Sequence, residues 1–168
     1  MAERQQVEGL LAEHRTTYAA QAGINLKDTP APLFQLLVLT ILLSARIRAD
    51  IAVAAARELF GAGWRTPKAM AESTWKQRVA ALGRAHYVRY VESTARALRE
   101  AAVRVLEVYQ GDLRKLADAA GGRSSRLRTL LTEFPRIGPA AAEIFCREAK
   151  AVWPWIETRR DRVTTAHT

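Results

Sequence analysis

Apolar residues recur every three or four positions along almost the whole chain, and no segment alternates strictly between apolar and polar residues. This spacing is the periodicity of an amphipathic α-helix, whereas alternation would indicate half-buried strands. The pattern therefore predicts an all-α protein. The expected helices cover about residues 3–20, 32–45, 49–61, 86–109, 111–120 and 139–150, and shorter ones start at Pro67, near Ser73 and behind Ser124 or Ser125, the last running to Phe134.

The longest apolar run, "LFQLLVLTILLSA" at 33–45, is apolar on every side of a helix. Such a helix is expected in the centre of the core, and it is too short to span a bilayer. The segment "GINLKDTPAP" at 23–32 contains two prolines and is predicted to be a loop. We therefore divide the chain into an N-terminal helix and loop at 1–29 and a helical domain at 30–168.

The charge balance points to a polyanionic partner. The 168 residues include 26 Lys plus Arg against 17 Asp plus Glu, for a net charge of +9. Such an excess favours nucleic acid first and an anionic membrane surface second. The alternative is an ordinary soluble protein from an Arg-rich proteome. The N-terminus "MAERQQVEGL" has no apolar signal core, so a cytoplasmic location is expected.

Metal and disulfide chemistry have little support in the sequence. Cys146 is the single cysteine, so no disulfide framework can form within the chain, and its apolar surroundings predict a core position. The three histidines, His14, His86 and His167, do not cluster at metal-ligand spacing. No metal ion and no cofactor are therefore expected.

The stretch "LTEFPRIGPAAAEIF" at 131–145 predicts a helix, a turn of about four residues and a second helix starting at Pro139. The first amides of a helix lack partners and lie at its positive end, which makes them an anion site. We expect Gly138 to allow a conformation or a close approach that a side chain would block. The alternative is a simple corner between two helices, and the cation Arg136 in the turn favours the anion site.

This stretch resembles the helix-hairpin-helix motif of the DNA glycosylase superfamily that includes endonuclease III, with its pattern of roughly Leu-Pro-Gly-Val-Gly-x-Lys-Thr-Ala. Four upstream segments are similar to family segments in the same order. They are "LVLTILLSARIRAD", "ELFGAGWRTPKAMAES", "ALGRAHYVRYVESTARAL" and "YQGDLRKLADAAGGRSSRLRTLL". The resemblance covers about residues 30–165 and implies a helix-hairpin-helix DNA glycosylase-like orthogonal helical bundle without the family's iron–sulfur loop.

The resemblance implies that duplex DNA is bent, a damaged base is flipped out and its glycosidic bond is cut. The residue that fills the gap in the stack would be Arg46, with Arg48 beside it; the alternative for Arg46 is a solvated charge at a helix end. Backbone contacts would come from Arg136, Ile137, Gly138 and Ala140. Ala140 stands where bifunctional members have a nucleophilic Lys, so lyase activity is not expected.

Every catalytic member also has an Asp after the second hairpin helix, which here corresponds to Asp161 or Glu157. Asp161 has the expected side chain, but it follows the hairpin at a slightly longer distance in sequence than usual. Glu157 lies closer to the expected distance but has a longer side chain. We prefer Asp161; the alternative is that both are ion-pair partners of the neighbouring arginines. Trp153 and Trp155 could stack on a base, but packing is the preferred role.

Two departures from the family pattern bear on function: Arg136 replaces a turn glycine, and the chain stops at Thr168, soon after the carboxylate. The chain is therefore expected to be either truncated or a reduced relative. The first hypothesis is a monofunctional DNA glycosylase of base-excision repair. The second is a helix-hairpin-helix module that holds bent or damaged DNA without cutting it, and a third, weaker one is a transcriptional regulator. Double-stranded DNA is the expected partner, and no membrane is.

Overall fold

The computed structural model describes residues 17–158, and every regular element in that range is an α-helix, which confirms the all-α prediction. The helices are α2 (Tyr18–Gln21), α3 (Pro30–Leu43), α4 (Ala49–Gly61), α5 (Pro67–Glu72), α6 (Trp75–Arg84), α7 (Val91–Tyr109), α8 (Arg114–Ala120), α9 (Ser124–Leu131) and α10 (Pro139–Ala149). No helix in this range is both long and apolar enough to cross a membrane.

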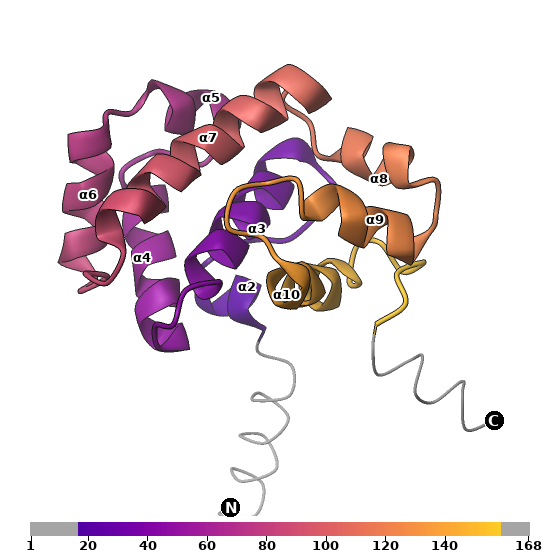
Figure 1. Ribbon diagram of the computed structural model, residues 1–168, viewed down its shortest axis with the longest axis horizontal. Coiled ribbons are helices and arrows are strands. Elements are labelled where there is room, and N and C mark those ends of the chain that lie inside the picture. The colour runs from indigo at the N-terminus through magenta and orange to yellow at the C-terminus, as the bar shows by residue number, and fades with distance from the viewer. Residues whose placement is uncertain (1–16, 159–168) are drawn as a thin grey trace, which may run out of the picture.

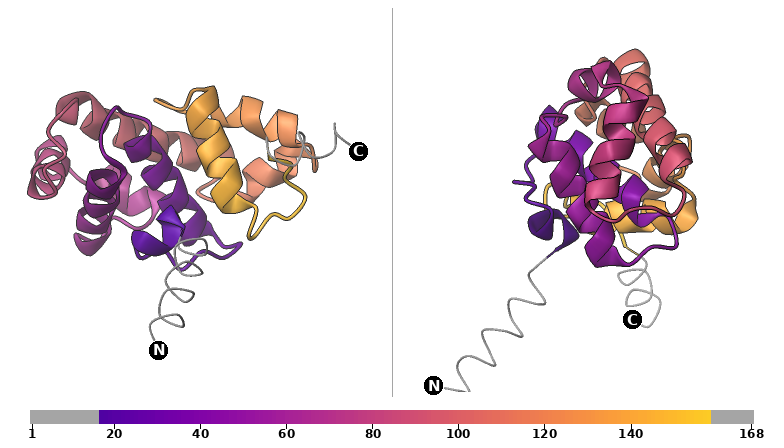
Figure 2. Two further views of the ribbon diagram at one scale, coloured as in Figure 1. Left: turned by 90° about the horizontal axis from the view of Figure 1, so that it is seen from below. Right: turned by 90° about the vertical axis from the view of Figure 1, so that its left-hand side faces the viewer.

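Helix α3 is the centre of the fold, as its uniformly apolar sequence predicts. Nine of its 14 residues are buried, and it packs against α2, α4, α7 and α10. Figures 1 and 2 show α4 and α6 on one side of α3 and α8 and α9 on the other, with α7 running across both groups. The two ends of α3 therefore lie at two different surfaces of the molecule.

Several helices begin where the sequence places a start signal. The Thr66 hydroxyl accepts from the Ala69 amide at 3.2 Å, and Pro67 is the first residue of α5. Helix α6 begins behind Thr74 rather than Ser73, because Thr74 and Gln77 form a reciprocal capping box. Helix α10 begins at Pro139, as predicted.

Other predicted boundaries also differ from the structure. Helix α3 begins at Pro30, inside the predicted loop 23–32, and ends at Leu43 rather than 45. Thr17 is extended and caps Ala20, so a continuous helix over 3–20 is wrong at this residue, and positions before it lie outside the described range. Helix α7 begins at Val91 rather than 86, since Tyr90 has a φ of 58°. Helix α9 ends at Leu131 instead of Phe134. Helix α8 begins at Arg114 instead of 111, after a turn at Asp112.

Arg78 joins three helices from within the core. Only 2% of this residue is exposed. Its guanidinium donates to the Ala95 carbonyl at 2.8 Å and to the Ser73 carbonyl and hydroxyl at 2.6 and 2.9 Å. Burial of the charge lowers the pKa of Arg78. These contacts fix α6 against the end of α5 and against α7.

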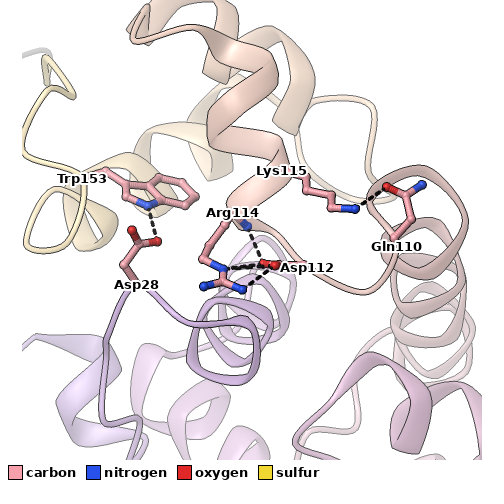
Figure 3. Close-up of polar contacts among 6 residues, drawn as sticks. All are labelled: Asp28, Gln110, Asp112, Arg114, Lys115 and Trp153. Carbon is pink, nitrogen blue, oxygen red and sulfur yellow. Dashed lines mark hydrogen bonds and ion pairs between the residues drawn. The ribbon is translucent and has the colours of Figure 1, made fainter.

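The segment after α10 returns to the loop before α3. The Trp153 indole N–H donates to the Asp28 carboxylate at 2.9 Å, as Figure 3 shows. Nearby, the ion pair between Asp112 and Arg114 and the hydrogen bond from Lys115 to Gln110 hold the start of α8. The Trp153 ring is 3% exposed and packs against Phe145 and Trp155, with ring centroids 6.0 and 6.1 Å away. Packing is therefore the role of Trp153, as the sequence analysis preferred.

Candidate nucleic-acid interface

The turn between α9 and α10 is anchored by two apolar side chains. Phe134 and Ile137 are 2% and 3% exposed. The Ile137 amide donates to the Phe134 carbonyl at 3.3 Å. Ile137 thus fastens the turn to the core, and neither its side chain nor its amide faces solvent. Of the turn residues predicted to touch DNA, this one has a packing role in the structure.

Arg136 occupies a position that glycine would suit. Its φ is 66°, in the left-handed region that costs a side-chain-bearing residue roughly 1–2 kcal/mol. The backbone therefore takes a conformation that glycine adopts readily, although the residue is Arg. The structure therefore holds a strained conformation at the tip of the turn, which is a common property of functional sites.

The start of α10 leaves backbone donors exposed. Gly138 is the N-cap, and the first helical bond is donated by Ala142 to the Gly138 carbonyl at 2.9 Å. Within residues 17–158, the amides of Gly138, Ala140 and Ala141 find no acceptor, and Pro139 has no N–H. Gly138 and Ala140 are exposed, while Ala141 is buried. Two unpaired amides therefore face solvent at the positive end of an 11-residue helix.

Gly138 has open space in front of it. Its φ of −89° and ψ of −173° are extended values that any residue can adopt. A Cβ built at this position would meet nothing within 4 Å. The expectation that Gly138 is needed for the chain's own backbone conformation is therefore wrong. A close approach that needs glycine here would have to come from a bound molecule.

Helix α7 holds both sides of the turn. On one side, Arg104 pairs with Glu133 at 2.8 Å and lies 5.5 Å from the Phe134 ring centroid. On the other side, the Arg136 guanidinium donates to the Ser93 hydroxyl and lies 5.8 Å from the Tyr90 ring centroid. The sequence places Arg136 as a cation in the turn, and the structure shows that its side chain is half-buried and anchored to α7.

The loop 86–90 adds exposed aromatic and apolar side chains beside the turn. Val88 is 68% exposed and Tyr90 is 50% exposed. Arg89 lies 5.9 Å from the Tyr90 ring centroid, so this ring has a guanidinium within cation–π distance from two different segments. His86 and Tyr90 both have positive φ, and with Arg136 they account for three of the four such non-glycine residues in the described range.

Tyr87 connects this loop to the end of α3. Its buried hydroxyl donates to the Leu42 carbonyl at 2.9 Å, and burial raises the pKa of Tyr87. Arg46 follows Leu42 by four residues and is exposed. An extended chain of that length spans at most about 14 Å. The Arg46 loop, the 86–90 loop and the hairpin therefore lie at the same end of α3.

Arg48 differs from Arg46 because it already has a partner. Its guanidinium makes two hydrogen bonds to Asp50, at 3.1 and 2.8 Å. The two side chains are 77% and 63% exposed, so the pair contributes little to stability and could be exchanged for a phosphate partner. Arg46 makes no such contact within residues 17–158. Of these two candidates, Arg46 is the one available to an approaching ligand.

Glu157, the one candidate carboxylate within residues 17–158, does not lie beside the turn. The Glu157 amide donates to the Ser124 hydroxyl at 2.6 Å, and its carbonyl accepts from Arg128. Glu157 is thus fixed at the start of α9, and the eight residues of that helix separate it from the turn by about 12 Å. Asp161, the preferred candidate, lies outside the described residues.

Cys146 behaves as the core residue that the sequence predicted. It is fully buried on α10, and burial raises the pKa of its thiol to about 11. A thiol with that pKa is a poor nucleophile at neutral pH. Ala140 is an exposed residue in the first turn of α10, so no side chain at this position can attack a sugar.

Sequence reasoning placed Tyr87, Arg89 and Tyr90 at the start of a long helix, with a mixed packing and phosphate-facing role, but it missed that they form a loop and that α7 anchors the hairpin. The predicted helix continues through this segment, whereas His86 and Tyr90 have positive φ and interrupt a regular helix there. The Arg104–Glu133 and Arg136–Ser93 contacts join residues far apart in the chain, so no local pattern could indicate them. No family model, no curated protein and no solved structure was found to match the chain.

Proposed function

We propose that the chain is an endonuclease III-like DNA glycosylase of base-excision repair, with the fold of the helix-hairpin-helix glycosylases, which binds and flips damaged DNA and has no lyase activity. The observation that carries the proposal is the pair of solvent-facing, unpaired amides at Gly138 and Ala140, with open space in front of Gly138. Backbone amides at a helix start bind phosphate oxygens in any sequence context.

The surroundings of the turn suit a bent duplex. A net charge of +9 supplies long-range attraction to DNA. Arg46, Arg89 and Arg136 lie on three segments at the same end of α3, so cations flank the amides. The exposed Val88 and Tyr90 offer apolar surface next to these charges. Together they can contact the backbone and an unstacked base step.

Under this proposal, base release would use water rather than a protein nucleophile, since Ala140 replaces the Lys of bifunctional relatives. The carboxylates on either side of the turn are in ion pairs, Glu133 with Arg104 and Glu143 with Arg128. Neither is placed to act on a sugar. Hydrolysis would therefore depend on Asp161 stabilising positive charge on the sugar or activating water.

The second candidate is a DNA-binding module that does not cut. The position of Glu157 at the start of α9 favours it, because the other carboxylate candidate is held away from the hairpin. The two functions share the hairpin and differ only in the step after flipping. A direct assay of base release separates them.

The test incubates the protein with duplexes that each carry one damaged base, followed by alkali to open abasic sites. A glycosylase cuts one of these duplexes after alkali treatment, and Asp161→Asn abolishes the cut while DNA affinity is unchanged. If no lesion is released but bent DNA is bound in a salt-sensitive manner, the binding module is correct. If the protein binds no duplex, both forms of the proposal fail.

A matched pair of charge variants tests the interface itself. Arg136→Gly removes the cation and suits the positive φ, and the buried side chains of Phe134 and Ile137 still anchor the turn to the core. We expect weaker binding to all sequences alike, with a salt slope reduced by about 1. Lys115→Gln removes one charge from α8, where Lys115 donates a hydrogen bond to Gln110, and should leave affinity nearly unchanged. Equal effects of the two variants would remove Arg136 from the interface.

A further inference from the structure

A second basic site lies at the opposite end of α3 from the hairpin. There, a pocket of about 640 Å³ opens between the loop before α3 and the end of α4. Three cations line it, and its lining contains no Asp or Glu. The lining residues are Ala22, Gly23, Asn25, Lys27, Thr29, Ala31, Pro32, Gln35, Arg57, Phe60, Gly61 and Arg65.

Two of the three cations are the arginines Arg57 and Arg65, and backbone carbonyls rather than carboxylates orient their guanidiniums. Arg57 Nε donates to the Gln21 carbonyl at 2.6 Å, and Arg65 Nε donates to the Phe60 carbonyl at 3.0 Å. Each bond fixes the side chain and leaves the two terminal nitrogens free for another acceptor. No ion pair of Arg57, Arg65 or Lys27 occurs within residues 17–158. Uncompensated positive charge is therefore collected in a concave site.

Gly23 lies beside one of these guanidiniums. Gly23 has a φ of 77°, and a Cβ built there would lie 4.0 Å from Arg57 Nη1. Gln35 approaches from α3 and donates its side-chain amide to the Arg65 carbonyl at 3.3 Å. The two guanidinium-bearing residues are thus held by contacts from the end of α2, from α3 and from α4.

The α3 dipole adds to this charge. Thr29 is the N-cap, its side chain makes no capping bond, and the Ala31 amide has no acceptor within the described residues. Since α3 has 14 residues, its positive end contributes about half a unit charge. This supplements the three side-chain cations, which by themselves define the site.

We propose that this pocket binds a small molecule carrying a phosphate monoester. Guanidinium groups bind phosphate oxygens through paired N–H donors, and three cations match a dianion. The volume lies within the range of small-ligand sites, and Phe60 and Pro32 supply apolar surface for the rest of the molecule. The 14 residues of α3 separate the pocket from the hairpin by about 20 Å, so it is distinct from the proposed DNA surface.

The test titrates the full chain with phenyl phosphate at constant ionic strength, using calorimetry, with sodium chloride as the control salt. We expect saturable binding that Arg57→Gln and Arg65→Gln each weaken by about tenfold or more, the loss of one charge-assisted hydrogen bond pair. Lys115→Gln, which removes the same charge from α8, should bind as the unaltered chain does. Circular dichroism checks that each variant is folded.

Lys27→Gln keeps the test decisive if the arginine variants fail to fold. Lys27 makes no hydrogen bond or ion pair within residues 17–158, so its replacement leaves the fold intact and should still weaken phenyl phosphate binding. Binding that is undetectable at millimolar concentration, or equal in the Lys27 and Lys115 variants, would overturn the proposal.

A DNA-binding assay with the same variants tests whether duplex DNA, rather than a small molecule, occupies the pocket. If Arg57→Gln lowers DNA affinity as much as Arg136→Gly does, the pocket is part of the DNA surface and the small-molecule site is wrong. If Arg136→Gly alone lowers DNA affinity while phenyl phosphate binding depends on Arg57, both proposals hold. Absence of DNA binding leaves the phosphate proposal intact, and absence of phenyl phosphate binding leaves the DNA proposal intact, because the two sites share no residue.

Discussion

Gly138→Ala separates a role of this glycine in folding from a role in binding. The backbone at Gly138 is extended, and the added methyl would meet nothing within 4 Å, so the substitution introduces neither strain nor a clash. Alanine is a poorer N-cap than glycine by roughly 0.5 kcal/mol or more, and it lowers the entropy of the unfolded chain by about 0.4–1 kcal/mol. The two effects nearly cancel, so stability should change by less than about 0.5 kcal/mol.

The effect on DNA binding should be much larger. The methyl would occupy the space through which a phosphate oxygen reaches the amides of Gly138 and Ala140. Each hydrogen bond to a charged group contributes about 1.5–3 kcal/mol, so the loss of one bond weakens binding by about tenfold and the loss of two by about a hundredfold.

The assay is fluorescence anisotropy with a labelled duplex at several salt concentrations, together with urea unfolding of each protein. Gly138→Ala should lower affinity by at least about tenfold while the free energy of unfolding stays within about 0.5 kcal/mol of the original value. Lys115→Gln on α8, which lies in neither proposed site, serves as the control. Unchanged affinity in Gly138→Ala would refute the reasoning that phosphate approaches this turn.

Three further predictions concern stability. Arg78→Met should destabilise the chain by about 3 kcal/mol in urea unfolding, because the Ser73 and Ala95 acceptors lose a buried donor; a loss under about 1 kcal/mol would contradict the described contacts. Glu148→Gln should leave stability at pH 7 unchanged or raise it by up to about 1 kcal/mol. Burial raises the pKa of Glu148 in the fold, so its carboxyl contributes most to stability at pH values below its usual pKa of 4.5, and this contribution is lost as the pH rises. The amide oxygen of Gln at this position can still accept a hydrogen bond from the Ala19 amide. A marked loss of stability at pH 7 would show that the charge is needed. Burial also raises the pKa of Tyr87, so stability should fall as the pH rises above the usual value of 10.0, and Tyr87→Phe should reduce that fall; identical pH profiles would contradict it.

Much of the fold follows from local patterns in the sequence. The run 33–45 is apolar on every side, so it could only be a buried helix, and α3 is that helix. Thr66 with Pro67, and Gly138 with Pro139, mark helix starts because they supply an N-cap and a fixed φ. These signals act within one turn of helix and can be read without knowledge of the neighbouring helices.

The parts that were not predictable depend on contacts between distant segments. Tyr90 takes a left-handed conformation although nothing in its residue type favours one, because the packing of Tyr87 against α3 sets the path of the loop. The basic pocket collects Lys27, Arg57 and Arg65 from segments about 30 residues apart. In the sequence each of the three is an ordinary surface charge. Only the folded chain places the Gln21 and Phe60 carbonyls where they accept from the Nε atoms of Arg57 and Arg65 and hold the two guanidiniums.

The central claim is that the amides at the start of α10 bind the sugar–phosphate strand, and nuclear magnetic resonance tests it most directly. A titration of the ¹⁵N-labelled chain with a short duplex should move the amide signals of Gly138 and Ala140 further than those of the exposed residues Arg114 and Lys115 in the first turn of α8. If the duplex binds while the signals of Gly138 and Ala140 stay in place, the amides do not contact DNA and the account is wrong.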